Sequence, residues 1–382
     1  MQISIVHQHS LQNEIAKARM VEITRPNQSQ RLTQLDGLRG LAALLVFIEH
    51  AHNSFAGPDP VSFLRYTPLG PLLWGGATAV ILFFVLSGLV LALPAMRAMP
   101  KPFASFYARF MTLRLFRIYP AFWFALLVSL VASTLYVPSN GGTLFWNTGP
   151  WEIPHREMLH YFLLIPNFHA ALIDGPAWTL TVEMQMSLLM PTLIVAFRSA
   201  DTRWGTLLLI ALACGLGWRF LWLHYLPMFA LGVALARHWE RANILARRLS
   251  PVGFTALALV AFASFSMPQD PPIAVEWIVT LVMGVLLILA VQSTGLARFL
   301  DCGPVQFLGR ISYSFYLLHM PIFLLLLSWL QPFVHSAVLV FLVALPVVCL
   351  ASFGAFIWVE RPAIRYSHRL VDWFHARSLR HA

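Results

Sequence analysis

Long apolar segments alternate with short polar segments along most of the chain. Apolar runs lie near 36–55, 71–93, 118–137, 178–197, 205–222, 225–238, 252–267, 274–293, 311–330 and 337–358. Most of these runs are about 17–22 residues long, enough for a helix to cross a hydrocarbon layer roughly 30 Å thick. The strict alternation of a membrane β-barrel strand does not occur in them. The pattern predicts an all-α, polytopic integral membrane protein with about ten transmembrane helices.

The two ends of the chain differ from this pattern. Residues 1–33 are polar and lack a continuous apolar core, so they predict neither a secretory signal nor a spanning helix. We expect a cytoplasmic N-terminal tail at 1–33, one membrane domain at 34–362 and a basic cytoplasmic C-terminal tail at 363–382.

Composition and charge agree with a membrane protein and set its orientation. Of 382 residues, 58% are hydrophobic and only 11% are charged, and the mean hydropathy is +0.70, which excludes an ordinary soluble domain. If the N-terminus is cytoplasmic, only Arg65, Arg156 and Arg219 of the 26 Lys and Arg residues fall outside. The positive-inside rule therefore places both termini in the cytoplasm. The net charge of +10 is spread between spans, which argues against nucleic-acid binding. The three cysteines are far apart and predict neither a disulfide framework nor a metal site.

The first span, 36–55, carries charge at both ends. Arg39 and His50 are eleven residues apart, so on a helix they share a face and lie roughly 16 Å apart along the axis. Gly40 and Ala43 fall in the same sector, and this track of small residues predicts a reaction path to the imidazole. An ionisable side chain in a spanning helix marks a functional site by default. The structural alternative for His50 is a neutral histidine bonded to a neighbouring helix. Glu49 points about 100° away and could anchor another helix instead.

Further polar groups lie near the ends of other spans. Arg114 and Arg117 share a helix face, and their forked donors match phosphate oxygens, although positive-inside anchoring explains such arginines equally well. Glu183 lies inside the span at 178–197 and needs a partner, which could be a histidine, a substrate hydroxyl or an arginine.

The segment from Leu308 to Pro321 lines up the hydroxyls of Ser312, Tyr313 and Tyr316. These hydroxyls could bind a polar donor, although tyrosine is ordinary at a membrane interface. His319 could satisfy backbone groups freed by Pro321. In FFVLSG (83–88), the small residues could leave a gap for a ligand chain or, more commonly, allow close helix packing.

Six motifs in this order resemble the acyltransferase-3 family of bacterial membrane O-acyltransferases. They are LDGLRGLAALLVFIEH, FFVLSG, RLFRIYP, WTLTVE, LGRISYSFYLLHMP and the closing ERP, and they cover residues 35–362. The resemblance implies transfer of an acyl group, commonly acetyl, from acyl-CoA to a hydroxyl, often on a sugar of an envelope glycan. It implies no permanently bound cofactor or metal, and it places the protein in the bacterial inner (plasma) membrane.

The resemblance also implies roles for individual residues. It makes His50 the catalytic histidine, with Arg39 as its partner in the motif, and it matches Glu183 to the family's catalytic acid. We expect His50 to act as general base, and transfer through a covalent acyl-histidine is the alternative that the sequence leaves open. It assigns acyl-CoA binding to the following residues: Arg39, Arg114, Arg117, Ser312 and Tyr313. The chain departs from the family where Met184-Gln-Met-Ser187 replaces an aromatic pair, which affects the acceptor more than the chemistry. The expected partners are acyl-CoA, a carbohydrate or lipid-linked glycan acceptor, and the lipid bilayer.

Two readings from other classes compete with an enzyme. Buried ionisable residues also line the substrate paths of a multi-pass transporter or flippase for a glycan or lipid-linked sugar. Against a transporter, the sequence contains no evident inverted repeat and no matching pair of broken helices. A catalytically inactive membrane sensor is the third reading, and the presence of His50 with both paired arginines disfavours it.

Overall fold

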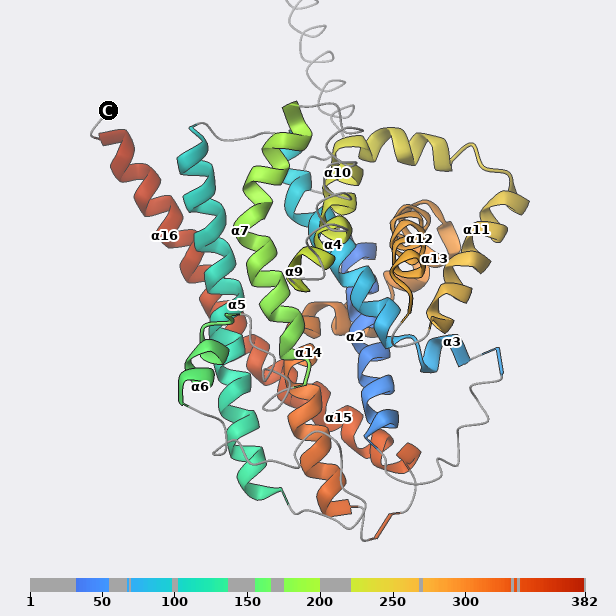
Figure 1. Ribbon diagram of the computed structural model, residues 1–382, viewed down its shortest axis with the longest axis vertical. Helices are drawn as coiled ribbons and strands as arrows, with labels where there is room; N and C mark the ends of the chain where they lie inside the picture. The colour runs from blue at the N-terminus through green and yellow to red at the C-terminus, as the bar shows by residue number, and fades with distance from the viewer. Residues whose placement is uncertain are drawn as a thin grey trace, which may run out of the picture. The chain divides into compact units, whose positions relative to one another are not determined.

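In the computed structural model, every regular element of the described residues is a helix (Figure 1). The described residues are 32–54, 67–68, 70–97, 102–136, 155–165, 175–199, 221–267, 271–330, 333–334 and 337–380. The elements are α2 (Thr33–Asn53), α3 (Gly70–Leu73), α4 (Gly76–Arg97), α5 (Phe103–Leu135), α6 (His155–Phe162), α7 (Ala177–Ser199), α9 (Leu221–His224), α10 (Leu226–Ala246), α11 (Pro251–Ala263), the 3₁₀ turn η4 (Ser264–Ser266), α12 (Ile273–Gln292), α13 (Thr294–Leu300), α14 (Gly303–Leu330), α15 (Ala337–Ala355), the π-helical segment η5 (Phe356–Glu360) and α16 (Arg361–Arg380).

Six helical segments of the described chain are long and apolar enough to cross a membrane. They are Gly76–Met96, Phe103–Leu135, Ala177–Arg198, Ile273–Gln292, Gly303–Leu330 and Val338–Phe374. The prediction of an all-helical membrane protein is confirmed, whereas the predicted number of about ten spans is not. The predicted first span is helical as α2, but it carries Asp36, Arg39 and Glu49 within its 21 residues. The span predicted at 205–222 lies almost wholly outside the described residues.

Helix α5 begins earlier than the apolar run that predicted it. It has 33 residues and starts at Phe103, fifteen positions before the expected start at Ile118. The arginines between these positions interrupt the apolar run but do not break a helix, and neither glycine nor proline occurs between Phe103 and Tyr119. At about 1.5 Å per residue, α5 is longer than the hydrocarbon layer is thick. Arg114 and Arg117 therefore lie on the body of a long helix.

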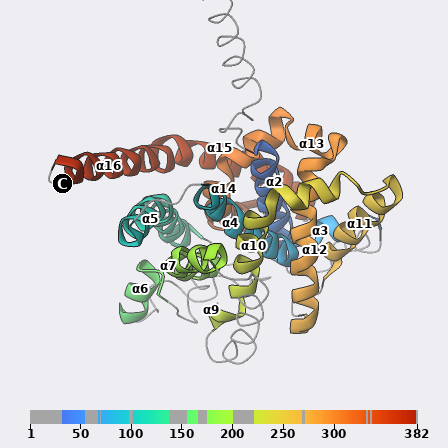
Figure 2. The same cartoon turned by 90° about the horizontal axis from the view of Figure 1, so that it is seen from above.

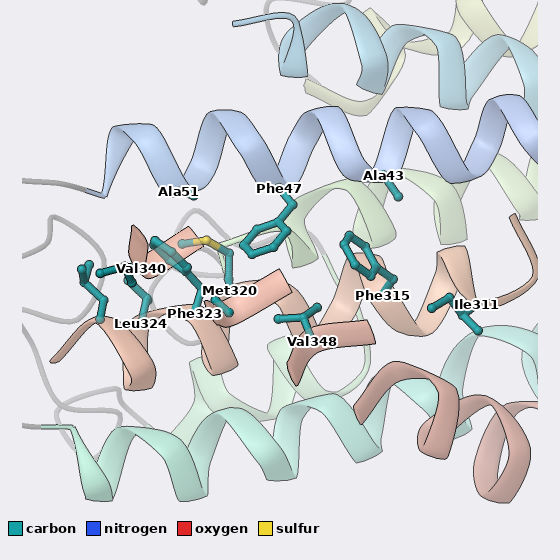
Figure 3. Close-up of a cluster of buried hydrophobic side chains, with 12 residues drawn as sticks. Ala43, Phe47, Ala51, Ile311, Phe315, Met320, Phe323, Leu324, Val340 and Val348 are labelled. Carbon is teal, nitrogen blue, oxygen red and sulfur yellow. The ribbon is translucent and has the colours of Figure 1, made fainter. Parts of the chain in front are cut away.

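Helices α2 and α14 pack side by side and run in the same direction. Phe47 of α2 contacts the rings of Phe315 and Phe323, at centroid distances of 5.7 and 5.6 Å. Figure 3 shows Ala43, Phe47 and Ala51 facing α14 in the order of its own sequence. Because lipid tails are as apolar as these side chains, close van der Waals contact holds the pair together. Seen from above, α2, α4 and α14 lie between α5 and α7 on one side and α11, α12 and α13 on the other (Figure 2).

The small residues of α2 bring its backbone against α14. A methyl group added at Gly40 would overlap the backbone of Gly309, and one added at Gly309 would overlap the carbonyl of Asp36. Ala43 is buried in the same interface. The interpretation of Gly40 and Ala43 as an open reaction path is therefore wrong, because α14 fills that face of the helix.

Helices α4 and α10 cross through a second glycine contact. An added methyl at Gly88 would overlap the carbonyl of Phe229, and one at Gly232 would overlap the carbonyl of Val85. The small residues of the FFVLSG motif thus permit close packing, which is the more common of the two readings of that motif.

Candidate active site

The side chains of His50 and His319 meet where α2 packs against α14. Nδ1 of His50 lies 2.9 Å from Nε2 of His319. Nδ1 of His319 lies 2.8 Å from the carbonyl oxygen of Tyr316 and 3.3 Å from that of Phe315. The His319 ring is fully buried, whereas His50 is partly exposed. His319 therefore links a buried backbone carbonyl to the partly exposed ring of His50.

The backbone carbonyl fixes the protonation of both neutral rings. A carbonyl only accepts hydrogen bonds, so Nδ1 of His319 carries the proton and its Nε2 carries a lone pair. Nδ1 of His50 must then donate to His319, which leaves the lone pair of His50 on Nε2. In this tautomer, Nε2 of His50 is the ring nitrogen that can accept a proton.

Aromatic packing holds the two imidazoles in place. Phe47 lies edge-on to His319 at a centroid distance of 5.5 Å, and Tyr316 lies 5.8 Å from His319. The hydroxyls of Tyr316 and Thr179 are hydrogen-bonded at 3.0 Å. Because Thr179 belongs to the WTLTVE motif, the first turn of α7 is attached to the helix that carries His319. A site supported in this way is preorganised by rigid elements.

A second polar cluster contains Arg114 and Glu183. One terminal nitrogen of Arg114 donates to the Glu183 carboxylate, and its Nε donates to the Ser187 hydroxyl at 3.1 Å. The arginine is buried and the carboxylate is partly exposed. Of the partners left open for Glu183, the structure supplies the arginine. Arg114 thus joins α5 to α7.

Arg117 lies in the same region with a different set of contacts. Its guanidinium is 3.7 Å from the carboxylate of Glu360 and 5.8 Å from the centre of the Tyr313 ring. The Tyr313 hydroxyl donates to the carbonyl of Ile118 at 2.9 Å, and Ser314 donates to Glu360 at 2.8 Å. The Arg117 side chain is 35% exposed, so it remains accessible to a ligand.

Arg39 lies near this group. It is 3.5 Å from Asp36, and the charges of Arg117, Glu183 and Arg114 are close enough to act on its guanidinium. Among the predicted site residues, the structure directly pairs Arg114 with Glu183 and Arg117 with Tyr313. Arg39, Arg114 and Arg117 form the arginine cluster of the site. His50 lies farther along α2, next to His319. The hydroxyl of the remaining residue, Ser312, donates to Gly309 within its own helix at 2.9 Å.

Sequence reasoning missed the role of two residues. His319 does bond to backbone carbonyls, but its other ring nitrogen contacts His50. Glu360 is buried and ion-paired with Arg117, so it is joined to the arginine cluster. The available signal was that His50 and His319 are both ionisable groups in apolar helices. Among the described residues, no group of three or more His, Cys, Asp or Glu side chains could hold a metal ion.

The site can be compared with known proteins. The acyltransferase-3 family model, described as an acyltransferase domain, matches residues 32–358. The chain belongs to the acyltransferase-3 family. This membership identifies it as an acyltransferase enzyme and disfavours the transporter and sensor readings. A comparison with solved structures finds no match.

Three named relatives of this acyltransferase-3 protein come from three different organisms. BcsY of Komagataeibacter xylinus, which carries the name of a membrane-bound transacylase, is 27% identical over 89% of this chain and 84% of its own length. Acyltransferase MdmB of Streptomyces mycarofaciens is 27% identical over 77% of this chain and 79% of its own. The peptidoglycan O-acetyltransferase OatA of Listeria monocytogenes is 24% identical over 80% of this chain, and the match covers about half of OatA, 52%.

Proposed function

We propose that this enzyme transfers an acyl group, most simply acetyl, from cytoplasmic acyl-CoA to a hydroxyl of a sugar in an envelope glycan or glycoside. The observation that carries the proposal is the hydrogen bond between Nδ1 of His50 and Nε2 of His319, whose direction places the His50 lone pair on Nε2. His50 is the general base, and its partial exposure allows an acceptor to reach it.

In the proposed reaction, the His50 imidazole carries the proton from the acceptor hydroxyl to the leaving sulfur. The acceptor oxygen attacks the thioester carbonyl carbon while its proton passes to Nε2 of His50. The tetrahedral intermediate then breaks its C–S bond, and the imidazolium returns the proton to the departing sulfur, so His50 ends neutral. General-base catalysis of this kind typically contributes about 10²- to 10⁴-fold in rate. The bond from Nδ1 to His319 persists throughout and keeps the ring oriented.

The arginine cluster provides the proposed donor site. Arg39 and Arg117 are 19% and 35% exposed, and their guanidinium groups match phosphate oxygens. Arg114 contributes positive charge but is held by Glu183 and Ser187. Tyr313 contacts Arg117, and Ser312 is its neighbour on α14. Arg39 is roughly 16 Å from His50 along α2. Because α14 fills the Gly40 and Ala43 face between them, the acyl end has to reach the imidazole along another face.

Glu183 has a supporting role in this proposal. Its carboxylate neutralises Arg114 and fixes α7 against α5. Thr179 lies four residues earlier on the same helix and bonds to Tyr316, so the position of Glu183 also sets how α7 meets the histidine pair. Glu183 thereby acts on catalysis by fixing α7 and does not itself transfer a proton.

The acceptor class rests on the relatives and on the predicted topology. The names of OatA and BcsY refer to transfer of acyl groups, and OatA acts on peptidoglycan. The distribution of arginine and lysine supports cytoplasmic termini, and the family resemblance supports the inner membrane. An enzyme with donor arginines at the inner end and a base farther along α2 suits a cytoplasmic donor and an acceptor at the other face.

Thioester consumption by the purified enzyme tests the proposal. His50→Gln keeps a hydrogen-bonding side chain but cannot take a proton at neutral pH, so turnover should fall by about 10²-fold or more while acetyl-CoA binding is retained. His52→Gln, two positions further along α2, is the matched control and should remain active. Substantial transfer by a well-folded His50→Gln enzyme would eliminate the general-base role.

A further inference from the structure

A second polar pair lies outside the catalytic machinery. Nε2 of His224, at the end of α9, is hydrogen-bonded to the carboxylate of Glu276 in the first turn of α12. Removing such a pair from water costs free energy, and two well-packed apolar residues would often serve stability equally well. The side chains remain 20% and 17% exposed, so a ligand can reach them. The pair therefore has the features of a binding site.

Aromatic rings adjoin this pair. The ring of His224 lies edge-on to Tyr225 at 5.0 Å, and Tyr225 lies 5.5 Å from Trp178. Phe84 of α4 contacts both Tyr225 and Trp178, at 5.2 and 6.4 Å. A carboxylate and an imidazole beside partly exposed aromatic rings offer hydrogen bonds to hydroxyls and apolar faces to C–H groups. A sugar ring presents both kinds of surface.

The position of this cluster suits an acceptor. Trp178, Tyr225 and Glu276 lie at or beside the first residues of α7, α10 and α12. In the predicted topology, the corresponding spans at 178–197, 225–238 and 274–293 all start at the outer surface. Three helix starts that are far apart in sequence thus meet on the side where an envelope glycan would enter.

Contacts also connect the cluster to the catalytic pair. Trp178 directly precedes Thr179, whose hydroxyl is bonded to that of Tyr316. Tyr316 contacts His319, which holds His50. We infer that Trp178, His224, Tyr225 and Glu276 form the acceptor subsite and bind a saccharide ring of the acceptor. This inference rests on the proposed function, because it assigns the substrate of the same reaction.

Steady-state kinetics with acetyl-CoA and methyl β-glucoside or N-acetylglucosamine test the subsite. Glu276→Gln and Trp178→Phe should raise the KM for the saccharide by roughly tenfold or more, because a charge-assisted hydrogen bond or a ring contact is weakened. The KM for acetyl-CoA, and thioester hydrolysis without saccharide, should stay within about twofold of wild type. Glu240→Gln and Trp358→Phe, both at exposed positions, are the matched controls.

A binding measurement separates this inference from the proposed function. Saccharide should raise the unfolding temperature of the wild type and of Glu240→Gln, but not that of Glu276→Gln. If wild type consumes no thioester yet shows this pattern, the proposed function fails and the subsite stands. Unchanged saccharide KM and unchanged thermal response in both subsite variants would overturn the inference. Equal use of a simple aliphatic alcohol, with the same sensitivity to Glu276→Gln, would also overturn it.

Discussion

The carboxylate of Glu49 accepts a hydrogen bond from the backbone N–H of Gly76, the first residue of α4. Glu49 is buried and directly precedes His50. The structure thus confirms one alternative derived from the sequence, in which Glu49 anchors another helix. Because a helix N-terminus favours a negative charge, this contact fixes α4 against the part of α2 that carries His50.

Loss of the hydrogen bond between Gly76 and Glu49 should lower the stability of the protein and reduce its kcat. Glu49→Ala leaves a buried N–H without its acceptor, which should cost about 1–3 kcal/mol, whereas Glu49→Gln retains an acceptor oxygen and should cost less. Thermal unfolding and kcat, measured together in detergent, check this order. Glu240→Ala, at an exposed position on α10, is the control. An unfolding temperature for Glu49→Ala equal to that of the control would contradict the assignment.

His319 should act as a positioning residue. His319→Leu removes the acceptor for Nδ1 of His50, and kcat should fall by about 10- to 100-fold, as for the partners that orient metal-bound histidines. His319→Gln can still accept that hydrogen bond and should recover part of the rate. The KM for acyl-CoA should not change in either variant. Equal kcat values for the two variants would indicate a purely structural residue.

The rate should also fall as the pH is lowered. In the proposed mechanism the neutral form of His50 is the active one, because the protonated ring has no lone pair to take the proton from the acceptor hydroxyl. The wild-type kcat should therefore fall on acidification and level off at higher pH. A pH–rate profile at saturating substrates checks this. A kcat that rises on acidification would require a group that acts in its protonated form.

The two arginines of the RLFRIYP motif should differ in what they do. Arg114→Met leaves Glu183 as an uncompensated, partly buried charge and should destabilise the protein by about 3–5 kcal/mol. Arg117→Ala would also leave the buried Glu360 without its ion-pair partner, so it is compared in a Glu360→Gln background. There it should mainly weaken acyl-CoA binding, by roughly 1.5–3 kcal/mol per lost charged contact. Isothermal binding and thermal unfolding distinguish the two. Adding Glu183→Gln to Arg114→Met should recover part of the lost stability.

Much of the fold and part of the site could be predicted from the sequence. Apolar length predicted most of the long helices, but it missed the first fifteen residues of α5 and all of α16. Helical spacing predicted a shared face for Arg114 and Arg117, whereas Arg114 contacts α7 and Arg117 contacts Glu360 and Tyr313. What pattern alone could not supply was pairing between distant segments. Nothing local to the motif at 308–321 indicates that His319 contacts His50, because that contact depends on how far α2 and α14 are staggered. The same applies to Glu183, whose partner is set by the packing of α7 on α5.

The backbone contact between Gly40 and Gly309 has a consequence for how the enzyme can move. This contact holds α2 and α14 together at one end, and His50 and His319 join them again about ten residues further on. Sliding or tilting of either helix would therefore break the hydrogen bond between the two histidines. The histidine pair is thus held in one position. In the proposed reaction, any movement that admits the acceptor, closes over it and releases the product must come from elements that pack around this pair. The first turn of α7, attached through the hydroxyls of Thr179 and Tyr316, is the nearest such element.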